Sequence, residues 1–233
     1  MKKVWYAPNR LEAYGEEEIK AVEESLRAGW LAGFGPRTIE FEEKIAKEFG
    51  KKYGVFVNSG SSACLLALAA LNLPKGSKVI TPALTFSTTL APIIQLGFIP
   101  IFIDSNLTSY VPTVEDILDK ITPDVKAIMV PNLIGNKPDW GLLKAGLELM
   151  DRNDIILIED SADTVTYTKE SDVSTTSFYA SHVITAGGMG GMVMFNDEKH
   201  VKRALMYRDW GRIGDNSENM SKRFAHDVDG IPY

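Results

Sequence analysis

Gly54-Val55-Phe56-Val57-Asn58-Ser59-Gly60-Ser61-Ser62-Ala63 occupies residues 54–63, and an apolar segment continues from it to Leu71. The run Gly54–Asn58 is typical of a strand, and Ser62–Leu71 is typical of a helix. The glycine and serines between them indicate a tight turn. This stretch therefore predicts a strand that passes directly into a helix, which is the repeating unit of α/β folds.

The same alternation continues along the rest of the chain. Further strands are expected at Lys78–Thr81, Ile99–Ile103, Ala127–Val130, Ile155–Glu159 and Met192–Phe195. Further helices are expected at Thr88–Leu96, Val114–Lys120, Trp140–Met150 and Glu198–Tyr207. Two more helical patterns precede them and end at Gly29 and Gly50. The alternation predicts an α/β fold with a mostly parallel sheet covered by helices on both faces, in three layers.

Composition excludes several classes of protein. A chain of 233 residues with 45% hydrophobic and 24% charged residues is typical of a globular protein with one large core. The net charge of −6, without a basic run, argues against a nucleic acid or an anionic membrane as partner. Cys64 is the one cysteine, so the sequence predicts no disulfide framework and no metal site.

The apolar segments are too short for targeting or membrane insertion. Met1–Pro8 carries charge without an apolar region behind it, so we expect no signal peptide. The most apolar stretch, Leu90–Ile103, is interrupted by polar residues and prolines. These features predict a cytoplasmic protein.

Two polar motifs lie at predicted strand ends, where open α/β sheets bind their ligands. The turn at Asn58–Ala63 could hold a phosphate, because a helix start offers free N–H groups and a favourable dipole. A plain turn with a serine N-cap explains the same residues. Asp160 follows the apolar run Ile155–Glu159, and an acidic residue there also suits a solvated turn or a helix cap. Taken alone, these motifs leave both interpretations open.

Three consecutive segments carry a family resemblance. They are Ile158-Glu159-Asp160-Ser161-Ala162-Asp163, then Ser177-Phe178-Tyr179-Ala180-Ser181-His182-Val183-Ile184-Thr185, then Gly187-Gly188-Met189-Gly190-Gly191. In this order they resemble the pyridoxal-phosphate (PLP) sugar aminotransferases of the DegT/DnrJ/EryC1/StrS family, and the likeness covers nearly the whole chain. It implies the large domain of the fold type I, aspartate aminotransferase-like, PLP-dependent transferases. We expect residues 1–233 to form this PLP-binding domain with its N-terminal helical segment, without a complete C-terminal small domain.

The resemblance assigns roles to individual residues. Gly60, Ser61, Ser62 and Ser177 match the segment that grips the cofactor phosphate. Asp160 matches the carboxylate that keeps the pyridine nitrogen protonated, which lets the ring withdraw electrons during catalysis. Asp163 matches a position beside the cofactor, and Phe86 matches the aromatic residue that stacks on its ring. Taken alone, a phenylalanine such as Phe86 is more often a core residue.

His182 stands where the aminotransferases carry their Schiff-base lysine. A histidine cannot form that bond, but it can act as a general base near neutral pH. The resemblance therefore implies the branch of nucleotide-sugar 3-dehydratases, which hold PLP or pyridoxamine phosphate (PMP) without a covalent bond. A lone histidine also commonly has only a structural role. Lys169 and Lys199 lie nearby in sequence, but neither takes the lysine position.

The implied reaction is removal of the 3-hydroxyl from a nucleotide-linked 4-keto-6-deoxyhexose, in the synthesis of surface polysaccharide sugars. One arm of this branch uses an iron–sulfur cluster bound after a segment like Arg208–Arg212, but Ile213–Ser217 has no cysteine. The cluster-free type, which takes an amino-acid donor such as glutamate, fits better. By resemblance, the protein is expected to be a homodimer.

Two alternatives remain at this point. The chain could be an aminotransferase of the same fold, which would need another lysine to replace the missing amine. It could also be a truncated cofactor-binding module without catalysis.

Overall fold

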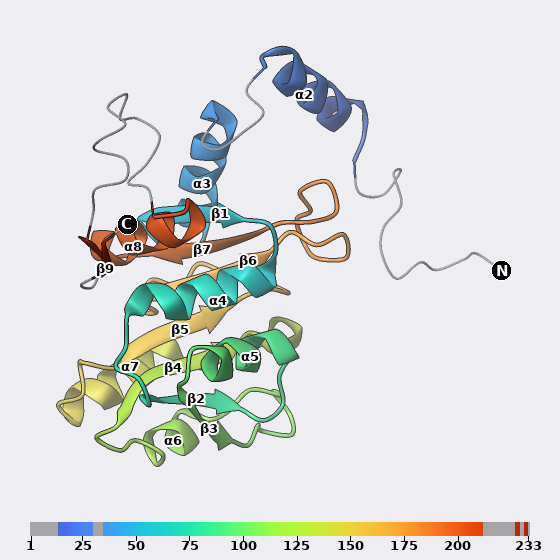
Figure 1. Cartoon of the computed structure of the whole chain (residues 1–233). Coiled ribbons are helices and arrows are strands. Elements are labelled where there is room, and N and C mark those ends of the chain that lie inside the picture. The colour runs from blue at the N-terminus through green and yellow to red at the C-terminus, as the bar shows by residue number, and fades with distance from the viewer. Residues whose placement is uncertain (1–13, 30–34, 212–226, 229–230, 233) are drawn as a thin grey trace.

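The computed structural model describes residues 14–29, 35–211, 227–228 and 231–232. Its centre is a seven-stranded sheet in the order β1-β7-β6-β5-β4-β2-β3 (Figure 1). The strands are β1 Tyr53–Val57, β2 Lys78–Pro82, β3 Ile99–Ile103, β4 Val125–Pro131, β5 Ile156–Asp160, β6 Val173–Ser177 and β7 Gly191–Phe195. β7 runs antiparallel to both of its neighbours, and the pairs from β6 to β3 are parallel. The expectation of a mostly parallel sheet is confirmed.

Helices cover both faces of this sheet. The helices of the described residues are α2 Glu16–Arg27, α3 Pro36–Glu48, α4 Gly60–Leu71, α5 Ser87–Gln95, α6 Val114–Leu118, α7 Trp140–Leu149 and α8 Glu198–Arg208, with a 3₁₀ turn at Leu133–Gly135. α2 buries no residue and lies apart from the sheet (Figure 1). α4, α5 and α8 pack on one face, and α6 and α7 pack on the other, with α3 over β1 and β7 (Figure 1). A short antiparallel pair joins β8 Asp227–Val228 to β9 Ile231–Pro232.

β4 packs against both helical layers. Ala127 and Met129 belong to the core beneath α4 and α5, whereas Ile128 and Val130 belong to the core beneath α6 and α7. Successive side chains of a strand point to opposite faces, so a strand between two helical layers is apolar at every position. This is why continuous apolar runs in the sequence located six of the seven strands of this sheet.

One strand of the seven-stranded sheet was missed, and the short strands β8 and β9 were not expected either. β6 has the sequence Val173-Ser174-Thr175-Thr176-Ser177, which contains no apolar run, yet all five residues are buried. Its hydroxyls are satisfied internally, because Ser174 donates to Glu159 at 2.9 Å and Thr175 donates to Asp160 at 3.2 Å. Buried polar groups are tolerated when they are hydrogen-bonded in this way. Sequence patterns could not identify β6, because the carboxylates that accept hydrogen bonds from its side chains lie on β5.

The segments that follow these strands lie at one edge of the sheet. Gly60 follows β1, Phe86 follows β2, Asp163 follows β5 and His182 follows β6. The carboxyl ends of parallel strands meet at the same edge, so the predicted site residues converge there. Within the described ranges, no helix has both the length and the apolar character needed to cross a bilayer.

Candidate functional site

The predicted phosphate-binding turn lies where β1 ends and α4 begins. Ser59 caps α4, because its Oγ accepts a hydrogen bond from the backbone N–H of Ser62 at 3.1 Å. The N–H groups of Gly60 and Ser61 have no acceptor within the helix, as in the first turn of any α-helix. With the helix dipole, they favour an anion at this end. The capping and anion-binding interpretations are therefore compatible, because Ser59 caps the helix and leaves the next two N–H groups for a ligand.

The start of α4 lies directly against β6 and β7. A Cβ atom on Gly60 would lie 2.7 Å from the Cβ of Ser177, and one on Gly191 would lie 2.2 Å from the carbonyl oxygen of Ser59. Neither position has room for a side chain. Ser177 is buried, and its Oγ accepts a hydrogen bond from the Tyr179 N–H at 3.3 Å. The structure thus brings Gly60 and Ser177 together, while their contact with a phosphate stays a prediction.

Asp160 ends β5 and points toward α4 and α5. Its carboxylate accepts hydrogen bonds from Thr89 Oγ1 at 2.7 Å and from Thr175 Oγ1 at 3.2 Å. Burial raises the pKa of the Asp160 carboxyl, and the hydroxyl bonds oppose this shift only in part. The interpretation of this residue as part of a solvated turn is wrong, since its side chain lies in the interior. A buried carboxylate held by neutral donors is a suitable partner for a cation.

Phe86 immediately precedes α5 and is not a core residue, because 70% of its surface is exposed. Its carbonyl oxygen accepts a hydrogen bond from the N–H of Thr89, the same residue whose hydroxyl reaches Asp160. The first turn of α5 therefore connects the exposed ring with the buried carboxylate. An exposed aromatic ring at the binding edge is available for stacking.

His182 and Asp163 form a pair that links the segments after β5 and β6. His182 Nε2 lies 3.5 Å from an Asp163 carboxylate oxygen. The Asp163 side chain is 53% exposed and the His182 side chain is 21% exposed. The other imidazole nitrogen, Nδ1, is buried and has no hydrogen-bond partner within the described residues. The ring of Tyr179 meets the imidazole edge-on at 5.8 Å between centroids.

The sequence interpretation missed Thr89 and Thr175, the two donors to Asp160. Thr175 lies two residues before Ser177, so both side chains are on the same face of β6. Thr89 lies one helical turn after Phe86, which is the spacing that puts two residues on one helix face. These spacings are visible in the sequence. They do not identify either threonine as a site residue until Asp160 is known to be buried between the two.

A second buried polar cluster lies behind the site, on the other face of β5. Glu159 is fully buried and accepts hydrogen bonds from Asn132 Nδ2 at 2.7 Å and Thr168 Oγ1 at 2.9 Å. Lys51 donates to the carbonyl oxygen of Thr168. Burial lowers the pKa of Lys51 to about 8, although Glu159 and Asp172 act in the opposite direction. The backbone N–H of Asn132 also donates to the backbone carbonyl of Asp160 at 2.8 Å. This cluster therefore helps to hold in place the end of β5, where Asp160 lies.

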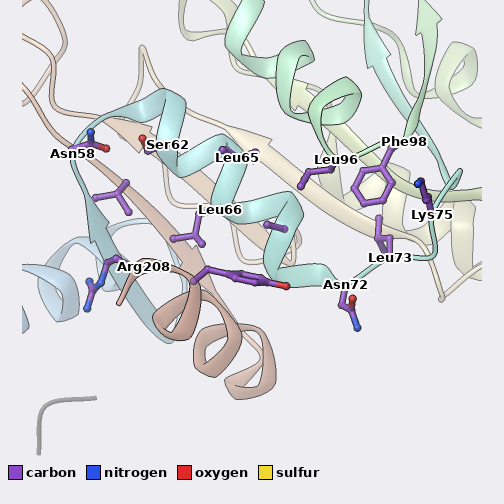
Figure 2. A pocket seen from close by; sticks show the side chains of 13 residues that line it. Asn58, Ser62, Leu65, Leu66, Asn72, Leu73, Lys75, Leu96, Phe98 and Arg208 are labelled. Carbon is purple, nitrogen blue, oxygen red and sulfur yellow. The ribbon is translucent and has the colours of Figure 1, made fainter. Parts of the chain in front are cut away.

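An apolar groove of about 910 Å³ runs along the outer side of α4 (Figure 2). Leu65, Leu73, Leu96 and Phe98 are among its lining residues. Of the predicted site residues, Ser62 alone lines it, so the groove is separate from the His182 pair. No group of three or more potential metal ligands occurs within the part of the chain that the structure describes.

Comparison with known proteins gives one consistent family. A model of the DegT/DnrJ/EryC1/StrS aminotransferase family matches residues 12–232. The dTDP-4-dehydro-2,6-dideoxy-D-glucose 3-dehydratase of Saccharopolyspora spinosa is 34% identical over 84% of this chain and 45% of its own length. The GDP-perosamine synthase of Escherichia coli O157:H7 is 33% identical over 93% of this chain and 59% of its own length.

Solved structures agree with the fold. The E. coli GDP-4-keto-6-deoxy-D-mannose-3-dehydratase with bound hydrated PLP superposes with a TM-score of 0.76 and 29% identity, over 89% of this chain and 54% of that chain. The expected PLP-dependent transferase fold is confirmed. The chain spans about half the length of these relatives.

Proposed function

The chain belongs to the DegT/DnrJ/EryC1/StrS aminotransferase family, and we propose that it acts with PLP or PMP as a nucleotide-sugar 3-dehydratase. Its substrate would be a nucleotide-linked 4-keto-6-deoxyhexose, and an amino acid such as glutamate would be the amino donor. The single observation that carries this proposal is His182, a histidine in the lysine position, paired with Asp163 at the edge of the sheet.

The residues present fit the cofactor. Asp160 is buried, its pKa is raised and its hydrogen bonds come from neutral hydroxyls, so a protonated ring nitrogen would offset the cost of burying its charge. Gly60, Ser61, Ser62 and Ser177 would hold the phosphate, because they surround the free N–H groups at the start of α4. Phe86 would cover one side of the ring. When bound, the cofactor would supply an electron sink for the charge that develops during elimination.

His182 would move the proton. Imidazole is suited to this task near neutral pH, and the His182 side chain is 21% exposed at the edge of the sheet, beside Asp163. Loss of the 3-hydroxyl would then make the product a deoxygenated sugar and not an amino sugar.

The aminotransferase alternative needs an amine at the site. Lys51 is the buried lysine whose pKa is lowered, but it donates to the Thr168 carbonyl on the Glu159 side of β5. Asp160 faces the opposite side, toward α4 and α5. Lys51 is therefore poorly placed to replace the missing lysine, and this favours the dehydratase.

The test is to load the purified chain with PLP, add glutamate and a nucleotide-linked 4-keto-6-deoxyhexose, and analyse the sugar by mass spectrometry. A deoxygenated sugar supports the proposal, whereas an amino sugar would establish the aminotransferase. Cofactor binding without any product would establish the third possibility, a binding module without catalysis. Sedimentation of the same sample tests the further proposal that residues 1–233 form a PLP-binding domain that associates as a homodimer.

A further inference from the structure

We propose that Asp163 is a positioning residue that sets which nitrogen of His182 carries the proton. In this assignment, Asp163 accepts a hydrogen bond from Nε2–H, and the lone pair of the neutral ring lies on Nδ1. The inference rests on the proposed function of His182, and the prediction that Asp163 lies beside the cofactor is tested by the same variants.

The two imidazole nitrogens have different surroundings. Nε2 lies 3.5 Å from the Asp163 carboxylate, and Nδ1 is buried without a hydrogen-bond partner in the described part of the chain. A lone pair on Nε2 would be repelled by the carboxylate, whereas an N–H there is attracted to it. In a neutral imidazole only one nitrogen carries hydrogen, so a proton on Nε2 leaves a lone pair on Nδ1.

The distance is compatible with this role. A separation of 3.5 Å is longer than an optimal hydrogen bond, but catalytic hydrogen bonds are often long before the reacting complex forms. The Asp163 side chain is more than half exposed, so it has room to rotate. A small rotation toward His182 would close the contact.

The imidazole itself is held by the segment that carries it. The His182 N–H donates to the Tyr179 carbonyl at 3.0 Å, and the Tyr179 ring meets the imidazole edge-on. Thr185 Oγ1 donates to the Phe178 carbonyl at 3.1 Å and closes the loop around His182. With the ring held in place, the remaining choice is the tautomer, and Asp163 is the charged group beside it.

The experiment is ¹⁵N NMR of histidine-labelled protein at a pH where imidazole is neutral. The chain has three histidines, His182, His200 and His226, and a His182→Gln sample assigns the relevant signals. The wild type should show His182 with hydrogen on Nε2. Asp163→Asn should shift the ratio toward the Nδ1–H form at least about fivefold, because the new amide N–H can donate to Nε2. Asp163→Glu should retain the wild-type tautomer.

Asp119→Asn is the matched control, because it removes one exposed carboxylate at the end of α6 without touching the site. An unchanged tautomer ratio in both Asp163→Asn and Asp163→Ala would overturn the inference. Since this readout requires neither cofactor nor turnover, it can succeed even if the wild type makes no deoxygenated sugar.

A second measurement separates positioning from cofactor binding. If Asp163 acts through His182, Asp163→Ala should lower kcat at least about tenfold, because the imidazole loses the carboxylate that holds its tautomer and stabilises its protonated form, and it should leave cofactor affinity unchanged. A fall in PLP affinity with unchanged kcat would instead make Asp163 a cofactor ligand and would contradict the inference.

Discussion

Gly60 and Ser177 meet so closely that a Cβ atom on Gly60 would lie 2.7 Å from the Cβ of Ser177. This contact sets the approach of α4 to the end of β6. The phosphate-binding turn therefore depends on the size of one residue as well as on its hydrogen bonds.

Gly60→Ala should push the start of α4 away from β6. We expect a loss of about 1–3 kcal/mol in the free energy of unfolding, which is typical of overpacking, and a weaker affinity for PLP. Chemical denaturation and PLP titration measure the two effects. Gly141→Ala is the control, since the nearest atom to a new Cβ there is 3.4 Å away on the Asp139 side chain. Equal stability of the two variants would contradict the close contact.

Asp160→Asn should separate stability from binding. The folded-state pKa of Asp160 is raised, so folding favours the protonated carboxyl, and its contribution to stability is lost as pH rises from the usual carboxyl range toward the folded value. The variant should therefore gain stability relative to wild type as pH rises through this window, while its PLP affinity falls.

Thermal unfolding of both proteins across acid and neutral pH tests this expectation. A difference between the two proteins that stays constant with pH would show that Asp160 carries no burial cost.

Lys51→Met should alter stability at alkaline pH. Burial lowers the folded-state pKa of Lys51 to about 8, so the unfolded chain binds more protons above that pH, and the wild type should gain stability as pH rises toward the usual lysine range. A pKa difference of one between the folded and unfolded chains corresponds to about 1.4 kcal/mol, so the difference between 10.5 and about 8 sets an upper bound of about 3.5 kcal/mol on this gain. The variant should lack the gain, as measured by urea denaturation from neutral to alkaline pH. Lys52→Met, at an exposed neighbouring position, should behave like the wild type.

His182→Lys should bind PLP covalently, because the substitution supplies the amine that the site lacks. Borohydride treatment followed by mass spectrometry should find the cofactor fixed at position 182 in the variant and no fixed cofactor in the wild type. His200→Lys, on α8, is the control and should give no trapping. If the variant binds PLP but resists trapping, position 182 does not face the cofactor.

The sequence predicted most elements because their apolar patterns are local. The Ser62–Leu71 pattern located α4 to within two residues of its start, and the run Ile155–Glu159 located β5 to within one residue at each end. β6 has no such pattern, because its serines and threonines are stabilised by Glu159 and Asp160 on β5. Spacing along one strand carries no information about donors and acceptors on the next.

Phe86 and Asp160 show the same limit within the site. Their residue types indicated a stacking ring and a carboxylate, but the simpler alternatives, a core phenylalanine and a solvated acidic turn, were open until burial was known. The structure excludes both alternatives, because Phe86 is exposed and Asp160 is buried.

By itself, the sequence determined most of the strands and helices along the chain, the family, and the presence of histidine rather than lysine at position 182, since each of these depends on local pattern and residue identity. The tertiary structure decided that Gly60 touches Ser177, that Thr89 and Thr175 satisfy Asp160, and that Asp163 stands beside His182. These contacts join residues far apart in the chain or on neighbouring loops, and they arise only when parallel strands bring their carboxyl ends to one edge of the sheet.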